Sequence, residues 1–210
     1  MRRLLLLTIC VTGFLAGNPR CFAGDSSGAR TNSVRPGIWA MPLHATNLSN
    51  FFLVTTNLYR GAQPNAKGMA ELKCYGIRTV FNLRSFHSDA GELKGLDFKP
   101  ARLHMKPWHA EEADVVNFLK IAADTNNWPV FVHCQRGADR TGLVCAMYRV
   151  VICGWTKQDA IAEMTEGGFK FDPRWKNIVK FIETADIEGI KRQAGIVEAL
   201  NRGTVESLNR

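Results

Sequence analysis

The chain has 210 residues, of which 46% are hydrophobic and 22% charged, and its formal net charge at pH 7 is +8. This composition is typical of one soluble globular domain with a sizeable core, and it excludes a disordered or fibrous protein. The basic excess favours anionic partners. However, it is spread along the chain and forms no basic block, so we expect no nucleic-acid partner.

The first 23 residues have the layout of a secretory signal peptide. The basic start Met1-Arg2-Arg3 precedes an apolar run over residues 4–16, and Cys21-Phe22-Ala23 offers a cleavage site before Gly24. The alternative is an uncleaved N-terminal anchor, which the length of the run disfavours because it is too short to span a bilayer comfortably. We therefore expect an exported protein, with no stable membrane span after cleavage.

The rest of the chain alternates between strand-like and helix-like segments. Residues 24–50 are rich in Gly, Ser, Asn and Pro, which predicts a loosely structured lead-in. Residues 51–185 alternate in a way that predicts one α/β domain with a central sheet, and residues 186–210 a helical tail. The expected strands are residues 51–59, 78–83, 101–105 and 129–132. The expected helices are residues 66–75, 113–123, 141–151, 156–166 and 173–184.

Four cysteines would remain after cleavage, and one of them stands apart. Cys145 and Cys153 lie in an apolar helical stretch, which indicates buried small hydrophobic residues, and the sequence leaves open whether Cys74, Cys145 and Cys153 form a disulfide. A chain of this length needs no disulfides for stability. Cys134, in contrast, follows an apolar strand directly and precedes Arg140 by six positions.

The segment between Cys134 and Arg140 has the pattern of a phosphate-binding loop. Five residues link the end of a buried strand to the start of a buried helix, so successive backbone N–H groups can form an anion-binding nest at the positive end of the helix. Gly137 permits backbone geometry that a side chain would oppose, and the planar guanidinium of Arg140 can hold two phosphoryl oxygens. The residues expected to bind the phosphoryl group are Gln135, Arg136, Gly137, Ala138, Asp139 and Arg140.

The same nest predicts a nucleophilic cysteine. A free thiol has a pKa of ~8.5, and a helix N-terminus with nearby cations can lower it to roughly 3.5–7.5. Cys134 would then attack phosphorus as a thiolate and form a phosphocysteine intermediate that water hydrolyses. Thr141 could donate a hydrogen bond to the sulfur when it leaves, while His133 is expected to order the loop backbone from behind. No second Cys/His pair has zinc-ligand spacing, so we predict neither a metal nor another cofactor.

The pattern H-C-x-x-G-x-x-R-T resembles the signature loop of the protein tyrosine and dual-specificity phosphatase superfamily. Residues 57–64 (NLYRGAQP) and 75–84 (YGIRTVFNLR) look like the N-terminal half of small dual-specificity-like phosphatases that bacteria export. Residues 147–151 and 154–169 are similar to the segment after the loop in those proteins. The resemblance covers about residues 51–185, and it implies a central, mostly parallel sheet flanked by helices.

The resemblance also implies a general acid, which the sequence leaves open. The family supplies an acidic residue from a loop before the catalytic strand, and Glu111 is the first choice in this chain, with His109 as the runner-up. Asp139 is a third candidate because Asp-Arg-Thr resembles the loop of phosphoinositide phosphatases; the alternative is that Asp139 only hydrogen-bonds the loop backbone. Arg136 would suit multiply phosphorylated substrates or could be a solvated surface residue.

The expected function is that of an exported phosphomonoester phosphatase, periplasmic if the source is bacterial. Its favoured partner is a phosphotyrosine protein, with phosphoserine and phosphothreonine also possible. A phosphoinositide or inositol-phosphate phosphatase is the first alternative. A phosphate-binding module without turnover, or sulfur transfer of the rhodanese type, are further alternatives, and Arg140-Thr141-Gly142 disfavours the last.

Overall fold

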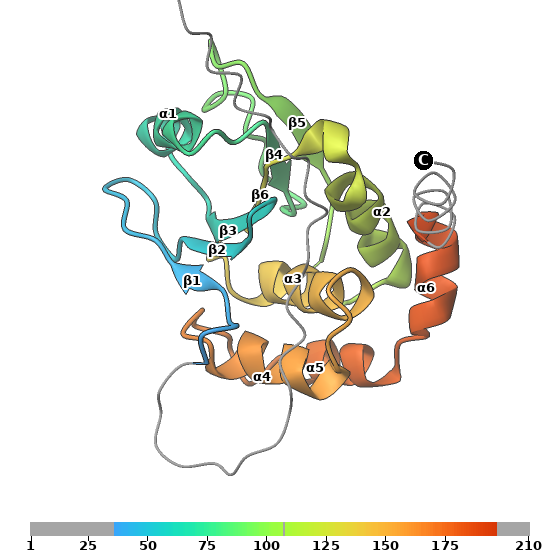
Figure 1. Ribbon diagram of the computed structural model, residues 1–210. Helices are drawn as coiled ribbons and strands as arrows, with labels where there is room; N and C mark the ends of the chain where they lie inside the picture. Colours follow the sequence, from blue (N-terminus) through green and yellow to red (C-terminus); the bar gives the residue numbers. More distant parts are fainter. Residues whose placement is uncertain (1–35, 107, 197–210) are drawn as a thin grey trace, which may run out of the picture.

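The computed structural model describes residues 36–106 and 108–196 (Figure 1). The predicted signal peptide and the end of the predicted tail lie outside the described residues. The strands are β1 Met41–Pro42, β2 Phe52–Thr55, β3 Leu58–Ala62, β4 Thr79–Asn82, β5 Lys99–Arg102 and β6 Val130–Cys134. The helices are α1 Ala66–Cys74, α2 Glu112–Ala123, α3 Asp139–Val151, α4 Lys157–Glu166, α5 Lys176–Thr184 and α6 Ile187–Ala194, with a 3-10 turn at Thr125–Asn127.

The strands form one mixed sheet in the order β1-β2-β3-β6-β4-β5. Strands β3, β6, β4 and β5 run parallel to one another, and β1 and β2 add an antiparallel edge. The expected α/β class with a mostly parallel central sheet is therefore confirmed. Because β6 lies in the middle of the parallel strands, the residues that follow it emerge at the centre of one sheet edge.

Helices cover both faces of the sheet, with α1 on one side and α2 to α6 on the other (Figure 1). Successive residues of a strand point to opposite faces, and the two cores follow this alternation. Val80 and Phe131 pack with Met69 and Leu72 of α1. Phe81, Val130 and Val132 join the larger core beneath the other helices. Strands buried on both faces explain the unbroken apolar run that precedes Cys134.

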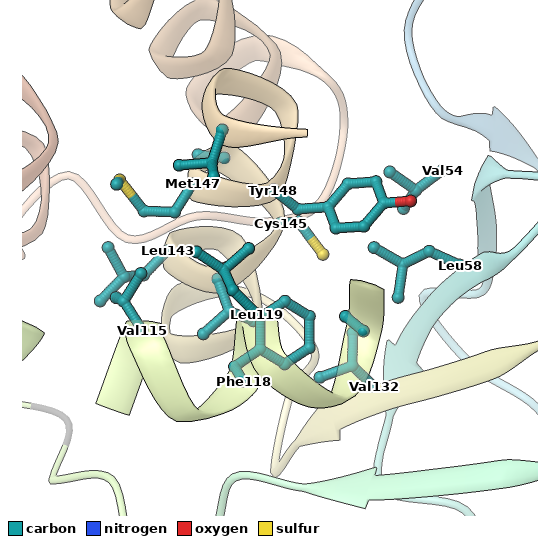
Figure 2. Close-up of a cluster of buried hydrophobic side chains, with 14 of the residues drawn as sticks. Val54, Leu58, Val115, Phe118, Leu119, Val132, Leu143, Cys145, Met147 and Tyr148 are labelled. Atoms are coloured by element: carbon teal, nitrogen blue, oxygen red, sulfur yellow. The ribbon is translucent and has the colours of Figure 1, made fainter. Parts of the chain in front are cut away.

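Helix α3 crosses the larger core and begins at the end of the loop that the sequence predicts to bind phosphate. Leu143 of this helix lies next to Leu119 and Phe118 of α2, whereas the Tyr148 ring points toward Val54 of β2 and Leu58 of β3 (Figure 2). Twelve of the thirteen residues of this helix are buried, as its apolar sequence predicted. Such burial gives the first turn of α3, and hence Arg140, a rigid support.

The structure has two strands, β2 and β3, in the region where the sequence predicted one. Residues 51–59 were expected to form a single strand, but Thr56 and Asn57 make a tight turn between the antiparallel strands β2 and β3. The Thr55 hydroxyl accepts a hydrogen bond from the Asn57 N–H at 3.3 Å and stabilises this turn. Short polar residues compete for backbone hydrogen bonds in this way, which explains the reversal.

Residues 36–50 are attached to the domain more firmly than a loose lead-in would be. The Ala40 N–H donates to the buried Glu163 carboxylate at 2.6 Å, and Glu71 accepts from the N–H groups of Thr46 and Asn47. The segment also contributes the two-residue strand β1 to the sheet, and side-chain acceptors hold the residues on both sides of it, so the segment shows no hydrophobic periodicity. Its anchoring could not be read from composition alone.

Helix α6 forms part of the predicted tail and ends before Gly195, which has a left-handed φ of 71°. Its Asp186 cap accepts a hydrogen bond from the Gly189 N–H at 3.0 Å. Within residues 36–106 and 108–196, no helix has the length and apolar character that a membrane span requires.

Candidate active site

The loop after β6 lies at the carboxyl edge of the parallel strands, where α/β proteins commonly bind ligands. Gly137 has a φ of 66°, and a Cβ there would overlap the backbone of Gly61 and lie 2.6 Å from the Ala62 nitrogen. The loop therefore passes directly over the end of β3. Only glycine allows both this backbone conformation and this close approach.

The environment of Cys134 favours its thiolate form. Burial alone would raise its pKa, but the Thr141 hydroxyl, the Arg140 guanidinium and the backbone N–H groups of Thr141 and Arg136 together bring the pKa below that of an ordinary thiol. The Thr141 hydroxyl is buried and finds no oxygen or nitrogen partner in the described part of the chain. The Cys134 sulfur is the acceptor left to it.

Arg140 is held in place by backbone carbonyls from two neighbouring loops. Its Nη1 donates to the Met105 oxygen at 3.2 Å and to the Leu83 oxygen at 3.4 Å. Leu83 directly follows β4, and Met105 lies in the segment after β5. These contacts orient the guanidinium and leave other N–H groups of its fork for an anion.

Asp139 uses both carboxylate oxygens in contacts inside the protein. Oδ2 accepts from Arg136 Nη2 at 2.8 Å, and Oδ1 accepts from the Asp172 N–H at 2.9 Å. Asp139 therefore ties the loop to the segment before α5, a geometry that favours a supporting role over proton donation. Arg136 remains more than half exposed and also lies 3.9 Å from the Asp172 carboxylate.

His133 lies fully buried behind the loop. Its Nε2 is 2.9 Å from Asp89 Oδ2, and its Nδ1 is 3.4 Å from the Cys134 oxygen. The ring also stacks on Phe131, with 5.7 Å between the ring centroids. The residue is thus placed to order the loop backbone.

The general-acid candidates lie on the loop before α2. Glu111 and His109 are exposed, with 3.5 Å between Glu111 Oε1 and His109 Nε2. Glu111 occupies the N-cap position of α2 without capping it through its side chain, so its carboxylate is free of that structural task. Asp114 in the first turn is partly buried, and burial, followed by the charge of Glu111, raises the pKa of its carboxyl.

His87, Asp89 and Glu92 bring potential metal-ligand atoms within 4.8 Å of one another. Asp89 Oδ1, however, already accepts from Gln63 Nε2 at 2.8 Å and from Asn82 Nδ2 at 2.9 Å, while its Oδ2 contacts His133. These three hydrogen bonds use three of the roughly four lone-pair sites of the carboxylate. The cluster is better described as a hydrogen-bonding junction than as a metal site.

Sequence reasoning missed Arg60, a residue of β3 that is only 2% exposed. Its Nη2 donates to the Gly137 oxygen at 2.8 Å and to the Ala138 oxygen at 3.4 Å, and its guanidinium lies 3.7 Å from the centre of the Phe169 ring. The available signal was a charged residue inside a strand whose neighbours are buried. Asp89 was missed because it lies in an irregular loop without a motif.

Known proteins share both the sequence and the fold. A family model described as "DSP-PTPase phosphatase fused to NAD+ Kinase" matches residues 46–173. The dual specificity protein phosphatase TpbA of Pseudomonas aeruginosa is 34% identical over 191 residues, which cover 89% of this chain and 82% of TpbA. The chain belongs to the tyrosine and dual-specificity phosphatase superfamily.

Solved structures of this phosphatase superfamily agree. The crystal structure of TpbA superposes with a TM-score of 0.68 at 30% identity, covering 77% of this chain and 99% of that one. A TpbA variant in complex with phosphotyrosine gives the same TM-score at 29% identity and the same coverage.

A second kind of relative is an inositol phosphatase. Inositol diphosphatase DSP3 of Arabidopsis thaliana is 28% identical over 153 residues, which cover 69% of this chain and 73% of DSP3.

The predicted enzyme class is therefore confirmed: the protein is a tyrosine or dual-specificity phosphatase. The structure brings Cys134, Arg140 and Thr141 together, with His133 and Arg60 beneath the phosphatase loop. Glu111 lies at the N-cap position of α2, beside His109.

Proposed function

We propose that this phosphatase removes the phosphoryl group of phosphotyrosine, and also of phosphoserine or phosphothreonine, through a phosphocysteine intermediate on Cys134. The observation that carries the proposal is the lowered pKa of Cys134 beside Arg140, at the base of a loop with inward N–H groups. The phosphotyrosine complex of the TpbA variant supports the choice of substrate.

The geometry supports a two-step mechanism. The Cys134 thiolate attacks phosphorus, and the bond between phosphorus and the ester oxygen breaks as the sulfur–phosphorus bond forms. The leaving oxygen takes a proton from the general acid, for which Glu111 is the first candidate. Water then attacks phosphorus and gives a proton to the carboxylate that the general acid left behind, the sulfur–phosphorus bond breaks, and inorganic phosphate is released while Thr141 stabilises the departing thiolate. Arg140 and the loop amides bind the equatorial oxygens in both transition states.

An inositol-phosphate phosphatase is the second candidate, because inositol diphosphatases are among the relatives. Exposed Arg136 could contact a second phosphate. The carboxylates of Asp139 and Asp172 nevertheless lie beside Arg136, and they reduce the positive charge at this side of the mouth. Because these two carboxylates offset the charge of Arg136, the site favours a substrate with a single phosphoryl group. A phosphate-binding module without turnover is the remaining alternative.

Export to the periplasm is also part of the proposal. It is supported by the basic start, apolar run and small-residue cleavage site in residues 1–23. An alkaline-phosphatase fusion to residues 1–30 in a bacterial host would test it: activity of the fusion supports export, and an inactive fusion retained in the cytoplasm contradicts it.

Hydrolysis of p-nitrophenyl phosphate by the chain starting at Gly24 tests the chemistry, with Cys134→Ser as the matched variant and a chelator present. Chelator-resistant turnover that the substitution abolishes supports the cysteine mechanism. Initial rates on a phosphotyrosine peptide and on an inositol polyphosphate then separate the two substrate classes. No turnover by the unsubstituted enzyme under reducing conditions would indicate the binding module.

A further inference from the structure

Asp89 accepts hydrogen bonds from three side chains that converge on it. The residue is 6% exposed and lies in the loop between β4 and β5. Its Oδ2 is 2.9 Å from His133 Nε2, and its Oδ1 accepts from Gln63 Nε2 and Asn82 Nδ2 at 2.8 and 2.9 Å. A single carboxylate thus satisfies donors from three separate segments.

The three donors belong to three adjacent parallel strands. Gln63 directly follows β3, Asn82 is the last residue of β4, and His133 is the penultimate residue of β6. Since β6 pairs with both of the others, Asp89 lies where the carboxyl ends of the three strands meet. It joins these ends through side chains, in addition to the backbone ladder in which Asn82 and His133 are still paired.

Each donor is in turn connected to the catalytic loop or to the support of Arg140. His133 directly precedes Cys134, and the backbone N–H of Gln63 donates to the Gln135 oxygen at 3.3 Å. Asn82 directly precedes Leu83, whose N–H donates to the His133 oxygen at 2.9 Å and whose oxygen accepts from Arg140. Displacement of Asp89 would therefore affect both the nucleophile and the phosphate-binding arginine.

We propose that Asp89 is a positioning residue that holds the Cys134 loop and the Arg140 support in the geometry of the transition state. The proposal rests on the cysteine mechanism proposed above. Asp89 touches neither substrate nor reacting atoms, and it acts through His133, Gln63 and Asn82. Its role is distinct from that of the general acid, which must reach the leaving oxygen.

The ionised form suits this role because a carboxylate accepts hydrogen bonds and donates none. Burial alone would raise the pKa of Asp89, but the hydrogen bonds from His133 and Gln63 and the nearby imidazoles bring it below its ordinary value. An asparagine in its place would present one oxygen and one NH2 group. If that NH2 group faced Gln63 and Asn82, both of these contacts would be lost. If it faced His133, the contact would survive only with the imidazole in its other tautomer, and the carboxylate that favours a proton on Nε2 would be gone.

The test compares Asp89→Asn with Asp89 in a Cys74→Ser background, which removes the exposed free thiol. The measured quantity is p-nitrophenyl phosphate turnover per active site, titrated by stoichiometric alkylation of Cys134. A displacement of reacting groups by about 1 Å can cost about 100-fold in rate, so we expect kcat to fall about 10- to 100-fold while KM changes less than about threefold. Inhibition by orthovanadate, which mimics the pentacoordinate phosphorus, should weaken about tenfold.

These readouts separate positioning from mere structural support. A structural role would lower the melting temperature or the titrated fraction, but the folded molecules would keep their normal kcat and vanadate inhibition constant. Asp97→Asn, an exposed acid of the same loop, is the matched control and should behave like the unsubstituted enzyme. If Asp89→Asn keeps both kcat per site and vanadate inhibition within about twofold, the proposal is overturned.

A second variant covers the case in which Asp89→Asn does not fold. Gln63→Met removes one donor to Asp89 and leaves the carboxylate and His133 in place, so kcat and vanadate affinity should both fall about three- to tenfold. Unchanged values in that variant would contradict the proposal. Absence of Cys134-dependent turnover in the unsubstituted enzyme would instead contradict the proposed function, so the two failures are distinguishable.

Discussion

The guanidinium of Arg60 donates a hydrogen bond to the carbonyl oxygen of Gly137 at 2.8 Å, from beneath the phosphate-binding loop. Arg60 thereby holds the carbonyl groups of Gly137 and Ala138 on the side of the loop that faces away from the proposed phosphate site. Burial lowers the pKa of Arg60, and the described residues contain no carboxylate in ion-pair contact with it. Such a cation is costly for folding, yet its charge favours both a bound phosphate and the Cys134 thiolate.

Arg60→Met should therefore separate activity from stability. Methionine of similar length removes the hydrogen bonds to Gly137 and Ala138 but also removes a buried charge, so the melting temperature should stay unchanged or rise. We expect kcat/KM to fall at least about tenfold, because the loop carbonyls lose their donor. Thermal unfolding and p-nitrophenyl phosphate kinetics on one preparation test this. An active variant of lowered stability would contradict the assignment.

Gly137→Ala should abolish activity, because the new methyl group would overlap the Gly61 backbone and occupy a left-handed conformation. The matched control is Gly95→Ala, which has a φ of 78° and no atom within 4 Å of the new Cβ. The control should cost about 1 kcal/mol of unfolding free energy, from backbone strain alone, and keep its activity. Equal activity of the two variants would show that the close approach at Gly137 does not matter.

The Thr141 hydroxyl lowers the pKa of Cys134, so its removal should raise that pKa. Alkylation by iodoacetamide follows the thiolate, and in the unsubstituted enzyme it should persist below the pH at which an ordinary thiol loses its reactivity. In Thr141→Val the profile should move to higher pH, because the thiolate loses the hydrogen bond from the hydroxyl. Burial raises the pKa of Cys145 to about 11, so Cys145 should not contribute. A profile that does not move would contradict the contact between Thr141 and the sulfur.

Glu111 can be tested as general acid through the leaving group. A poor leaving group needs the proton more, so Glu111→Gln should slow phosphotyrosine hydrolysis by about 10- to 100-fold and affect p-nitrophenyl phosphate much less. His109→Gln and Asp139→Asn, measured on the same pair of substrates, test the two other candidates. The variant with the largest difference between substrates identifies the acid, and equal losses on both substrates for Glu111→Gln would remove it from consideration.

A buried ion pair joins α3 to α4 and should dominate local stability. Arg149 donates to Glu163 through Nη2 at 2.7 Å and Nε at 2.9 Å, and the guanidinium lies 4.2 Å from the centre of the Trp155 ring. Glu163→Gln leaves a buried cation uncompensated, so unfolding in urea should show a loss of about 3–5 kcal/mol. Glu166→Gln, at an exposed position of the same helix, should change stability by less than about 0.5 kcal/mol. Similar losses in both variants would contradict the importance of the pair.

Local sequence was sufficient for the elements and for the centre of the site. The Asn65 cap, the apolar strand before Cys134 and the apolar helix after it are patterns of neighbouring residues, and the structure places α1, β6 and α3 where they were expected. Cys134 and Arg140 are also only six positions apart, on either side of one short loop between β6 and α3. Its chemistry depends on a strand end and a helix start that are both encoded locally.

The remaining features depend on contacts between distant segments, which only the tertiary structure decides. Arg60 reaches Gly137 across 77 positions, and Asp89 reaches His133 across 44. No periodicity marks such residues, because a buried polar side chain is determined by the donors and acceptors that the fold brings to it. The sequence by itself therefore identified the family, and it predicts Cys134 as the nucleophile and Arg140 as the phosphate-binding arginine. Chain packing determined which residues hold them in place.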